Sequence, residues 1–185
     1  MKKILAIIFA LALTGCAAPP PLNFSVPDVG VSKTRIDAEV KAVTVTLARP
    51  DEAKGSMPMG IEGITSFWKE SLQESIDRMA IFKDGAATKI SIQVKILAFE
   101  IPGFGASMTS KSIARYELID RASGSIAYTQ DITAHGTVPF NHAYVGATRA
   151  RESINRAAQN NIKLFLQALE TVDVTKPMFP SEARK

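Results

Sequence analysis

The sequence has a single cysteine and only two histidines among its 185 residues. One cysteine cannot form a disulfide within the chain, and it cannot supply the thiolate set of a zinc site. His135 and His142 lie seven residues apart without the H-E-x-x-H spacing of zinc hydrolases, so we interpret them as solvated loop histidines. We therefore expect no metal and no cofactor.

Signals for catalysis and for nucleotide binding are also scarce. The run Gly103-Phe104-Gly105 has two glycines in common with a phosphate-binding loop, but no helix pattern follows it and the full glycine series is missing. Asp120 fits a turn and Asp131 fits the solvent face of a strand, so the two carboxylates do not form an acid–base pair. The sequence predicts that the chain is not an enzyme.

Long apolar runs are scarce as well, and the longest lies at the start of the chain. Residues 4–13 are apolar and follow the positively charged Lys2 and Lys3. This order is typical of a secretory signal peptide, because an apolar stretch of about ten residues is too short for a membrane-spanning helix, which needs about 20. We expect residues 1–15 to be a signal peptide that is removed on export.

The apolar run ends in Leu13-Thr14-Gly15-Cys16, which resembles the lipobox of bacterial lipoproteins. The resemblance implies cleavage between Gly15 and Cys16 and attachment of lipid to Cys16. Each buried acyl methylene contributes roughly 0.8 kcal/mol, so two acyl chains hold a protein stably on a membrane. Ala17 stands where an aspartate would resemble an inner-membrane retention signal, which favours the outer membrane.

Net charge is low once the signal peptide is gone. The 22 Lys and Arg residues of the full chain become 20, because Lys2 and Lys3 are removed, and they face 18 Asp and Glu residues. This balance gives no basis for nucleic-acid binding. The remaining chain is long enough for one domain with a hydrophobic core.

Composition divides the mature chain into three parts. Residues 16–37 are expected to be the lipidated cysteine and a proline-rich tether, because Pro19-Pro20-Pro21 favours an extended spacer and no apolar period follows it. Residues 38–172 are expected to form a single domain. Prolines in a polar stretch predict a flexible tail over residues 173–185.

The periodicity of apolar residues predicts the order β-α-β-β-β-α within the domain. Such a chain packs most simply as an α+β two-layer sandwich, with a mainly antiparallel four-stranded sheet and two helices on one face. Trp68 lies in the apolar stripe of the first helix, where core packing is expected. The expected strands are 40–47, 89–99, 110–119 and 125–134, and the expected helices are 61–82 and 148–171.

Two features are candidates for contact with a partner. The connection over residues 101–108 has no charge and contains Ile101, Phe104 and Met108, which suits a surface that binds protein or lipid. The competing interpretation, which we favour for this loop, is that Phe104 packs back under the helices.

The second feature is a row of basic residues in the last helix. Arg149, Arg156 and Lys163 are spaced by seven, so they lie along one helix edge that can meet anionic headgroups or an acidic partner. The competing interpretation, which is the more common for such a row, is the solvated side of an amphipathic helix.

These features together resemble two groups of small envelope proteins: the YajG-type lipoproteins and the auxiliary lipoproteins of ABC-type lipid transporters. The resemblance rests on the lipobox, the proline spacer, the helix that carries Trp68, the hairpin around Ser123-Gly124 and the terminal helix. It implies an outer-membrane protein, anchored by lipid and facing the periplasm. Its role would be that of a non-enzymatic accessory in envelope assembly or in lipid or solute transport, through a partner protein or a lipid. The alternatives are a structural or secretion-pilot lipoprotein and, less favoured, an envelope enzyme.

Overall fold

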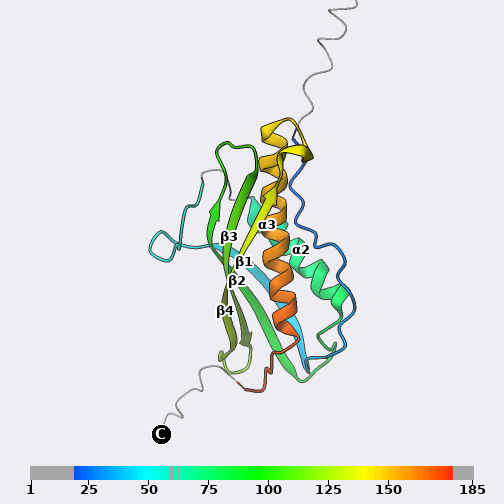
Figure 1. Ribbon diagram of the computed structural model, residues 1–185. Helices are drawn as coiled ribbons and strands as arrows, with labels where there is room; N and C mark the ends of the chain where they lie inside the picture. The colour runs from blue at the N-terminus through cyan, green and yellow to red at the C-terminus, as the bar shows by residue number, and fades with distance from the viewer. Residues whose placement is uncertain (1–18, 59–60, 62, 177–185) are drawn as a thin grey trace, which may run out of the picture.

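The computed structural model describes residues 19–58, 61 and 63–176, and it confirms the α+β two-layer arrangement. Four strands form one sheet in the order β1-β2-β3-β4, and two helices cover one of its faces (Figure 1). The strands are β1 (Ala38–Leu47), β2 (Thr88–Glu100), β3 (Met108–Asp120) and β4 (Ile126–Val138). The helices are α2 (Ile64–Met79) and α3 (Gly146–Leu169), with the short 3-10 helix η2 (Phe140–His142) before α3.

The sheet is mixed, because its first pair of strands is parallel. α2 carries the chain from the end of β1 back to the start of β2, so these two strands run in the same direction, whereas β3 and β4 follow as antiparallel neighbours. α2 is shorter than the predicted 61–82. It ends where Ala80 takes a left-handed conformation (φ 48°) and its N–H bonds to the carbonyls of Ile76 and Asp77.

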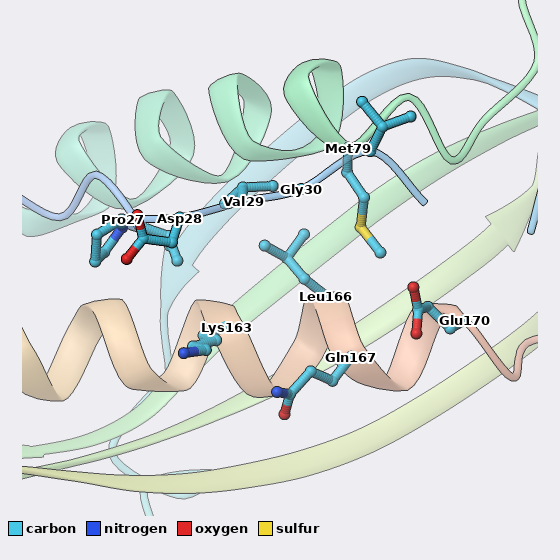
Figure 2. Close-up of a pocket in the computed structure, with 11 residues that line it drawn as sticks. Pro27, Asp28, Val29, Gly30, Met79, Lys163, Leu166, Gln167 and Glu170 are labelled. Atoms are coloured by element: carbon cyan, nitrogen blue, oxygen red, sulfur yellow. The ribbon is translucent and has the colours of Figure 1, made fainter. Parts of the chain in front are cut away.

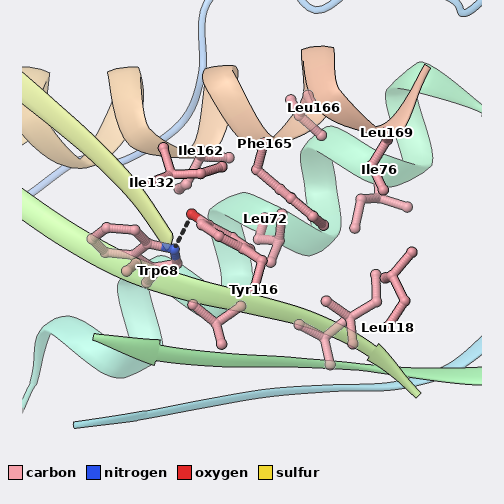
Figure 3. Packing of buried hydrophobic residues seen from close by; sticks show 14 of the residues in the cluster. Trp68, Leu72, Ile76, Tyr116, Leu118, Ile132, Ile162, Phe165, Leu166 and Leu169 are labelled. Atoms are coloured by element: carbon pink, nitrogen blue, oxygen red, sulfur yellow. Dashed lines mark hydrogen bonds between the residues drawn. The ribbon is translucent and has the colours of Figure 1, made fainter. Parts of the chain in front are cut away.

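The core lies between the helices and the inner face of the sheet (Figure 3). Trp68 of α2 is fully buried, as its place in the apolar stripe predicts. The ring of Phe165 of α3 stacks on that of Tyr116 of β3, with centroids 4.1 Å apart and planes inclined by 12°. Alternate apolar residues of the central strands, such as Ile92 and Val94, complete the layer.

A chain of hydrogen bonds runs through this core. The indole Nε1 of Trp68 donates to the Tyr116 hydroxyl (3.2 Å), which in turn donates to Oδ1 of Asn161 (2.9 Å). The Asn161 amide nitrogen donates to the Ile132 carbonyl (2.9 Å) and to Oγ of Ser112 (3.2 Å). These buried polar groups therefore all have partners, as burial requires.

α3 approaches β4 very closely at Gly136. A Cβ atom built on this glycine would lie 2.3 Å from the backbone nitrogen of Ala157 and 2.3 Å from the carbonyl oxygen of Ser153. Ser153 also exchanges a hydrogen bond with Ser110 of β3 (2.8 Å). Small residues on both surfaces thus fix the distance between the helix and the sheet.

The predicted tether is wrong for its later part, because three apolar side chains of residues 22–37 are buried in the domain. Phe24 is 1% exposed, and its ring lies edge-on to Trp68 at a centroid distance of 6.1 Å. Val26 and Ile36 are also buried. Each of these side chains fills a separate space against the domain, and the residues between them are partly or fully exposed. The segment therefore shows no apolar period in the sequence. The predicted tail starts late as well, since Val174 is buried.

The outer face of the sheet is polar and faces water, as the alternation predicts. Its charges are paired: Lys89 bonds to Glu39 and Arg115 to Asp131 (2.6 Å) across neighbouring strands, and Lys95 bonds to Glu52 (2.6 Å) of the connection after β1. Neither helix in the described part of the chain has the length and apolar composition needed to cross a bilayer. The predicted signal peptide and the predicted cleavage and lipidation residues, Gly15 and Cys16, lie outside the described residues.

Candidate functional site

One end of the molecule displays apolar side chains to solvent. Phe104 is 95% exposed and Tyr144 is 91% exposed, although both are aromatic. They lie on two connections that the sheet brings together, since Met108, which follows the first connection, pairs with Val138, which precedes the second. We call this surface the aromatic end, and it consists of Ile101, Phe104, Phe140, Tyr144 and Val145.

The local sequence explains why both connections stay at the surface. Gly105 has φ 155°, and a Cβ there would lie 2.9 Å from the Ser107 carbonyl oxygen, so the β2–β3 connection needs a glycine at this turn. Pro139 begins the second connection, and it supplies no N–H to continue the ladder of β4. The rings of Phe140 and Tyr144 then meet edge-on, 6.2 Å apart.

Arg149, in the first turns of α3, joins the two connections. Its Nη1 donates to the carbonyls of Ala143 (2.5 Å) and Tyr144 (2.9 Å), and its Nη2 donates to that of Gly105 (3.1 Å). The guanidinium carbon also lies 4.9 Å from the Phe140 ring centroid, within cation–π range. These bonds hold the backbones of the two connections in fixed positions behind the exposed side chains of the aromatic end.

The structure therefore corrects the predicted row of basic residues. Arg149 is only 5% exposed and belongs to the interior, because the connections fold over the start of the helix. Arg156 donates to Glu152 (2.8 Å) and to the Thr137 carbonyl (3.1 Å). Lys163 lies farther along, at a groove, so the three side chains form no continuous cationic surface.

That groove runs between α3 and the N-terminal segment (Figure 2). Its volume is about 230 Å³, and its walls are residues 26–31, Met79 of α2 and four side chains of α3. Ligand pockets are commonly about 300–1,000 Å³ in volume. The groove is therefore smaller than the usual pocket for a small-molecule ligand. The side chains of α3 are Lys163, Leu166, Gln167 and Glu170.

The acidic side chains singled out from the sequence are held as ions. The Arg115 guanidinium, with Lys54, keeps the pKa of Asp131 below its usual range. The pKa of Asp120 is lowered because the backbone and hydroxyl of Ser123 donate to its carboxylate. Both carboxylates stay ionised and already accept hydrogen bonds from neighbouring groups, so neither is suited to act as a general acid.

The histidines do not come together with other metal-binding groups. His142 lies in η2 and His135 lies on β4, so the loop assignment is correct for only the first of them. No group of three His, Cys, Asp or Glu side chains suited to a metal ion occurs within residues 19–58, 61 and 63–176.

The 101–108 connection is split between surface and core. The interpretation that Phe104 packs under the helices is wrong, because its ring points into solvent. Met108, by contrast, is buried, and Ile101 is partly exposed. Sequence reasoning missed Phe140 and Tyr144. The available signal was that residues 139–147 contain no charged residue, whereas Arg149, Arg151 and Glu152 follow within the next five positions.

Comparisons with known proteins find similar folds among solved structures. The Xanthomonas campestris protein XCC0632, of the family DUF330, has a TM-score of 0.49 and 8% identity and covers 81% of this chain and 94% of its own. The Chlamydia trachomatis protein CT253 has a TM-score of 0.46 and 10% identity, with 75% and 97% covered. A minor lipoprotein from Acinetobacter baumannii has a TM-score of 0.35 and 11% identity, with 69% and 92% covered.

No family model and no curated protein matches the chain. The three TM-scores lie below 0.5, and nothing about the function of this chain rests on them.

Proposed function

We propose that this chain is a lipoprotein of the bacterial outer membrane, anchored through Cys16 and facing the periplasm. Its role is that of a non-catalytic accessory in envelope assembly or in lipid or solute transport. It acts by contact, and the aromatic end is the contact surface. The observation that carries the proposal is the exposure of Phe104 and Tyr144 on connections that Arg149 holds in a fixed shape.

An exposed aromatic ring contributes little to folding, because it removes little apolar area from water. The same ring is among the strongest anchors when an interface buries it. The aromatic end presents several apolar side chains on a supported backbone, which reduces the entropy lost on binding. This combination favours a contact surface over a chance exposure of single residues.

The anchor itself is proposed from the sequence. The order of two lysines, an apolar run and Leu13-Thr14-Gly15-Cys16 supports export and lipidation, and Ala17 supports sorting to the outer membrane. The only cysteine of the chain has no disulfide partner within it, so lipid attachment is its one evident use.

The test of the anchor is Cys16→Ser in the full chain, expressed in a bacterium fed with labelled palmitate. We expect the label to disappear and the protein to leave the membrane fraction, because a hydroxyl does not replace the thiol as the lipid acceptor. Ala18→Ser is the matched control, since it adds a serine nearby and leaves Cys16 in place. A Cys16→Ser protein that keeps its acyl label and sediments with membranes after a high-salt wash would contradict the lipoprotein assignment.

A further inference from the structure

The described chain begins at the same end of the molecule as the aromatic end. Its first residues, blue in Figure 1, lie near the end of the molecule at which α3 begins, and they contact the first half of α3. A hydrogen bond holds this start in place, because the Asn155 amide donates to the Pro21 carbonyl (3.4 Å). A second bond, from the Asn23 N–H to Oδ1 of Asn155 (3.0 Å), also holds this segment against α3.

Simple lengths place the lipid near the aromatic end. Asn155 is nine residues after Gly146, the first residue of α3, and a helix rises by about 1.5 Å per residue, or about 14 Å in total. Cys16 precedes Pro21 by five residues, and an extended proline-rich chain of that length spans about 16 Å. A lipid on Cys16 is thus within reach of the level at which Tyr144 lies.

The composition of the aromatic end suits a bilayer interface. Residues 101–107 and 139–147 contain no Asp, Glu, Lys or Arg, whereas 22% of the whole chain is charged. Charged side chains are costly in apolar lipid, and aromatic rings favour the interface between headgroups and acyl chains. Arg149, which supports this surface from the start of α3, is buried and bonded to carbonyls.

We propose that the aromatic end inserts into the interface of the bilayer that holds the Cys16 lipid. Phe104 and Tyr144 are the inserting side chains, and Arg149 is the positioning residue behind them. The lipid and the rings then form two points of attachment that fix the orientation of the domain. The groove and the far end of the sheet point away from the membrane. This inference rests on the proposed lipidation of Cys16.

The test measures the depth of single introduced indoles in the lipidated full chain. The protein is reconstituted into vesicles of phosphatidylethanolamine and phosphatidylglycerol whose acyl chains carry bromine, which quenches nearby indoles. Phe104→Trp and Tyr144→Trp place an indole at the aromatic end. Val31→Trp is the matched control, because Val31 is 71% exposed and lies near Met79 at the opposite end. The wild-type chain gives the background of Trp68, which is fully buried.

We expect the emission of the Phe104→Trp and Tyr144→Trp chains to shift to shorter wavelength and to lose intensity in brominated vesicles. The Val31→Trp chain and the wild type should show neither change. Membrane-bound protein whose indoles at positions 104 and 144 remain unquenched would overturn the proposal. The proposal would also be overturned if the emission of these indoles shifted to shorter wavelength in native envelope membranes but not in the lipid vesicles. That result would indicate a protein partner.

The anchor and the insertion fail in different ways. If Cys16 carries no lipid, none of the variants floats with the vesicles, and the proposed function fails first. If all variants float but the indoles at positions 104 and 144 are not quenched, lipidation stands and insertion of the aromatic end is wrong.

Discussion

The middle of α3 and its first turns use polar side chains in opposite ways. In the middle, Asn161 bonds to strand carbonyls and to the Tyr116 hydroxyl, and Gly136 lets the helix backbone lie directly on β4. In the first turns, Arg149 bonds to carbonyls of two connections and raises them above the helix. The first arrangement excludes solvent, whereas the second displays rings to it.

This difference separates stability from function along a single helix. Closely packed small residues and satisfied polar groups stabilise one arrangement of the helix on the sheet. At the aromatic end the rings gain little from folding, so the exposure of several of them together needs another explanation. If the two regions differ in this way, substitutions in the middle of α3 lower the free energy of unfolding. Substitutions of the exposed rings at the aromatic end leave it unchanged.

The largest effect is expected from Phe24→Ala, because the N-terminal segment belongs to the packed region. Removing the buried ring should lower the free energy of unfolding by about 4 kcal/mol, the scale for emptying an aromatic site in a core. Urea denaturation followed by far-UV circular dichroism measures it. Val31→Ala in the same segment is the control and should cost less than about 0.5 kcal/mol. Equal and small effects would mean that this segment is a tether after all.

Gly136→Ala tests the close contact of α3 with β4. The new Cβ would overlap with backbone atoms of Ser153 and Ala157, which cannot rotate away, so the helix has to move. We expect a loss of about 3 kcal/mol, at the upper end of the usual cost of overpacking. Thermal and urea denaturation measure the loss.

The matched control for that substitution is Gly103→Ala. Nothing lies within 4 Å of the position that its Cβ would take, so its stability should equal that of the wild type. If Gly136→Ala is equally harmless, α3 is not held against the sheet as closely as described.

Tyr116→Phe tests the buried hydrogen-bond chain. Without the hydroxyl, the indole N–H of Trp68 and Oδ1 of Asn161 each lose a bond, which should cost about 2 kcal/mol. Tyr128→Phe is the control, because its hydroxyl bonds to the exposed Gln130 and should contribute less than about 0.5 kcal/mol. Burial also raises the pKa of both tyrosines, that of Tyr128 to about 12. If the two variants lost the same free energy of unfolding, the buried hydrogen bonds of Tyr116 would contribute no more to stability than the exposed bond of Tyr128.

The elements that the sequence predicted well are those with a strong internal period. The strand predicted over 89–99 alternates strictly from Lys89 to Ile96, and the helix over 148–171 has a continuous stripe. Each therefore places its apolar face without knowledge of the rest of the fold. The polar outer face of the sheet follows from the same alternation.

The misplaced residues depend on contacts between distant parts of the chain. Phe24 has no periodic neighbours, and only the neighbouring helices supply the space that buries it. Arg149 has the same spacing to Arg156 as Arg156 has to Lys163, and the sequence does not show that two connections cover the start of the helix. Phe104 lies in a connection whose path is set by Gly105 and by the bonds from Arg149, so its exposure is a property of the assembled end.

The smallest effect on stability is expected from the double variant Phe104→Ser, Tyr144→Ser. Both rings are almost fully exposed, so the free energy of unfolding should change by less than about 0.5 kcal/mol. The same variant should lose the additional membrane contact of the lipidated chain, measured as faster transfer from vesicles to acceptor vesicles, because only the acyl chains remain to hold it. A loss of about 3 kcal/mol or more in unfolding free energy would place these rings in the core and remove the contrast between the two regions of α3.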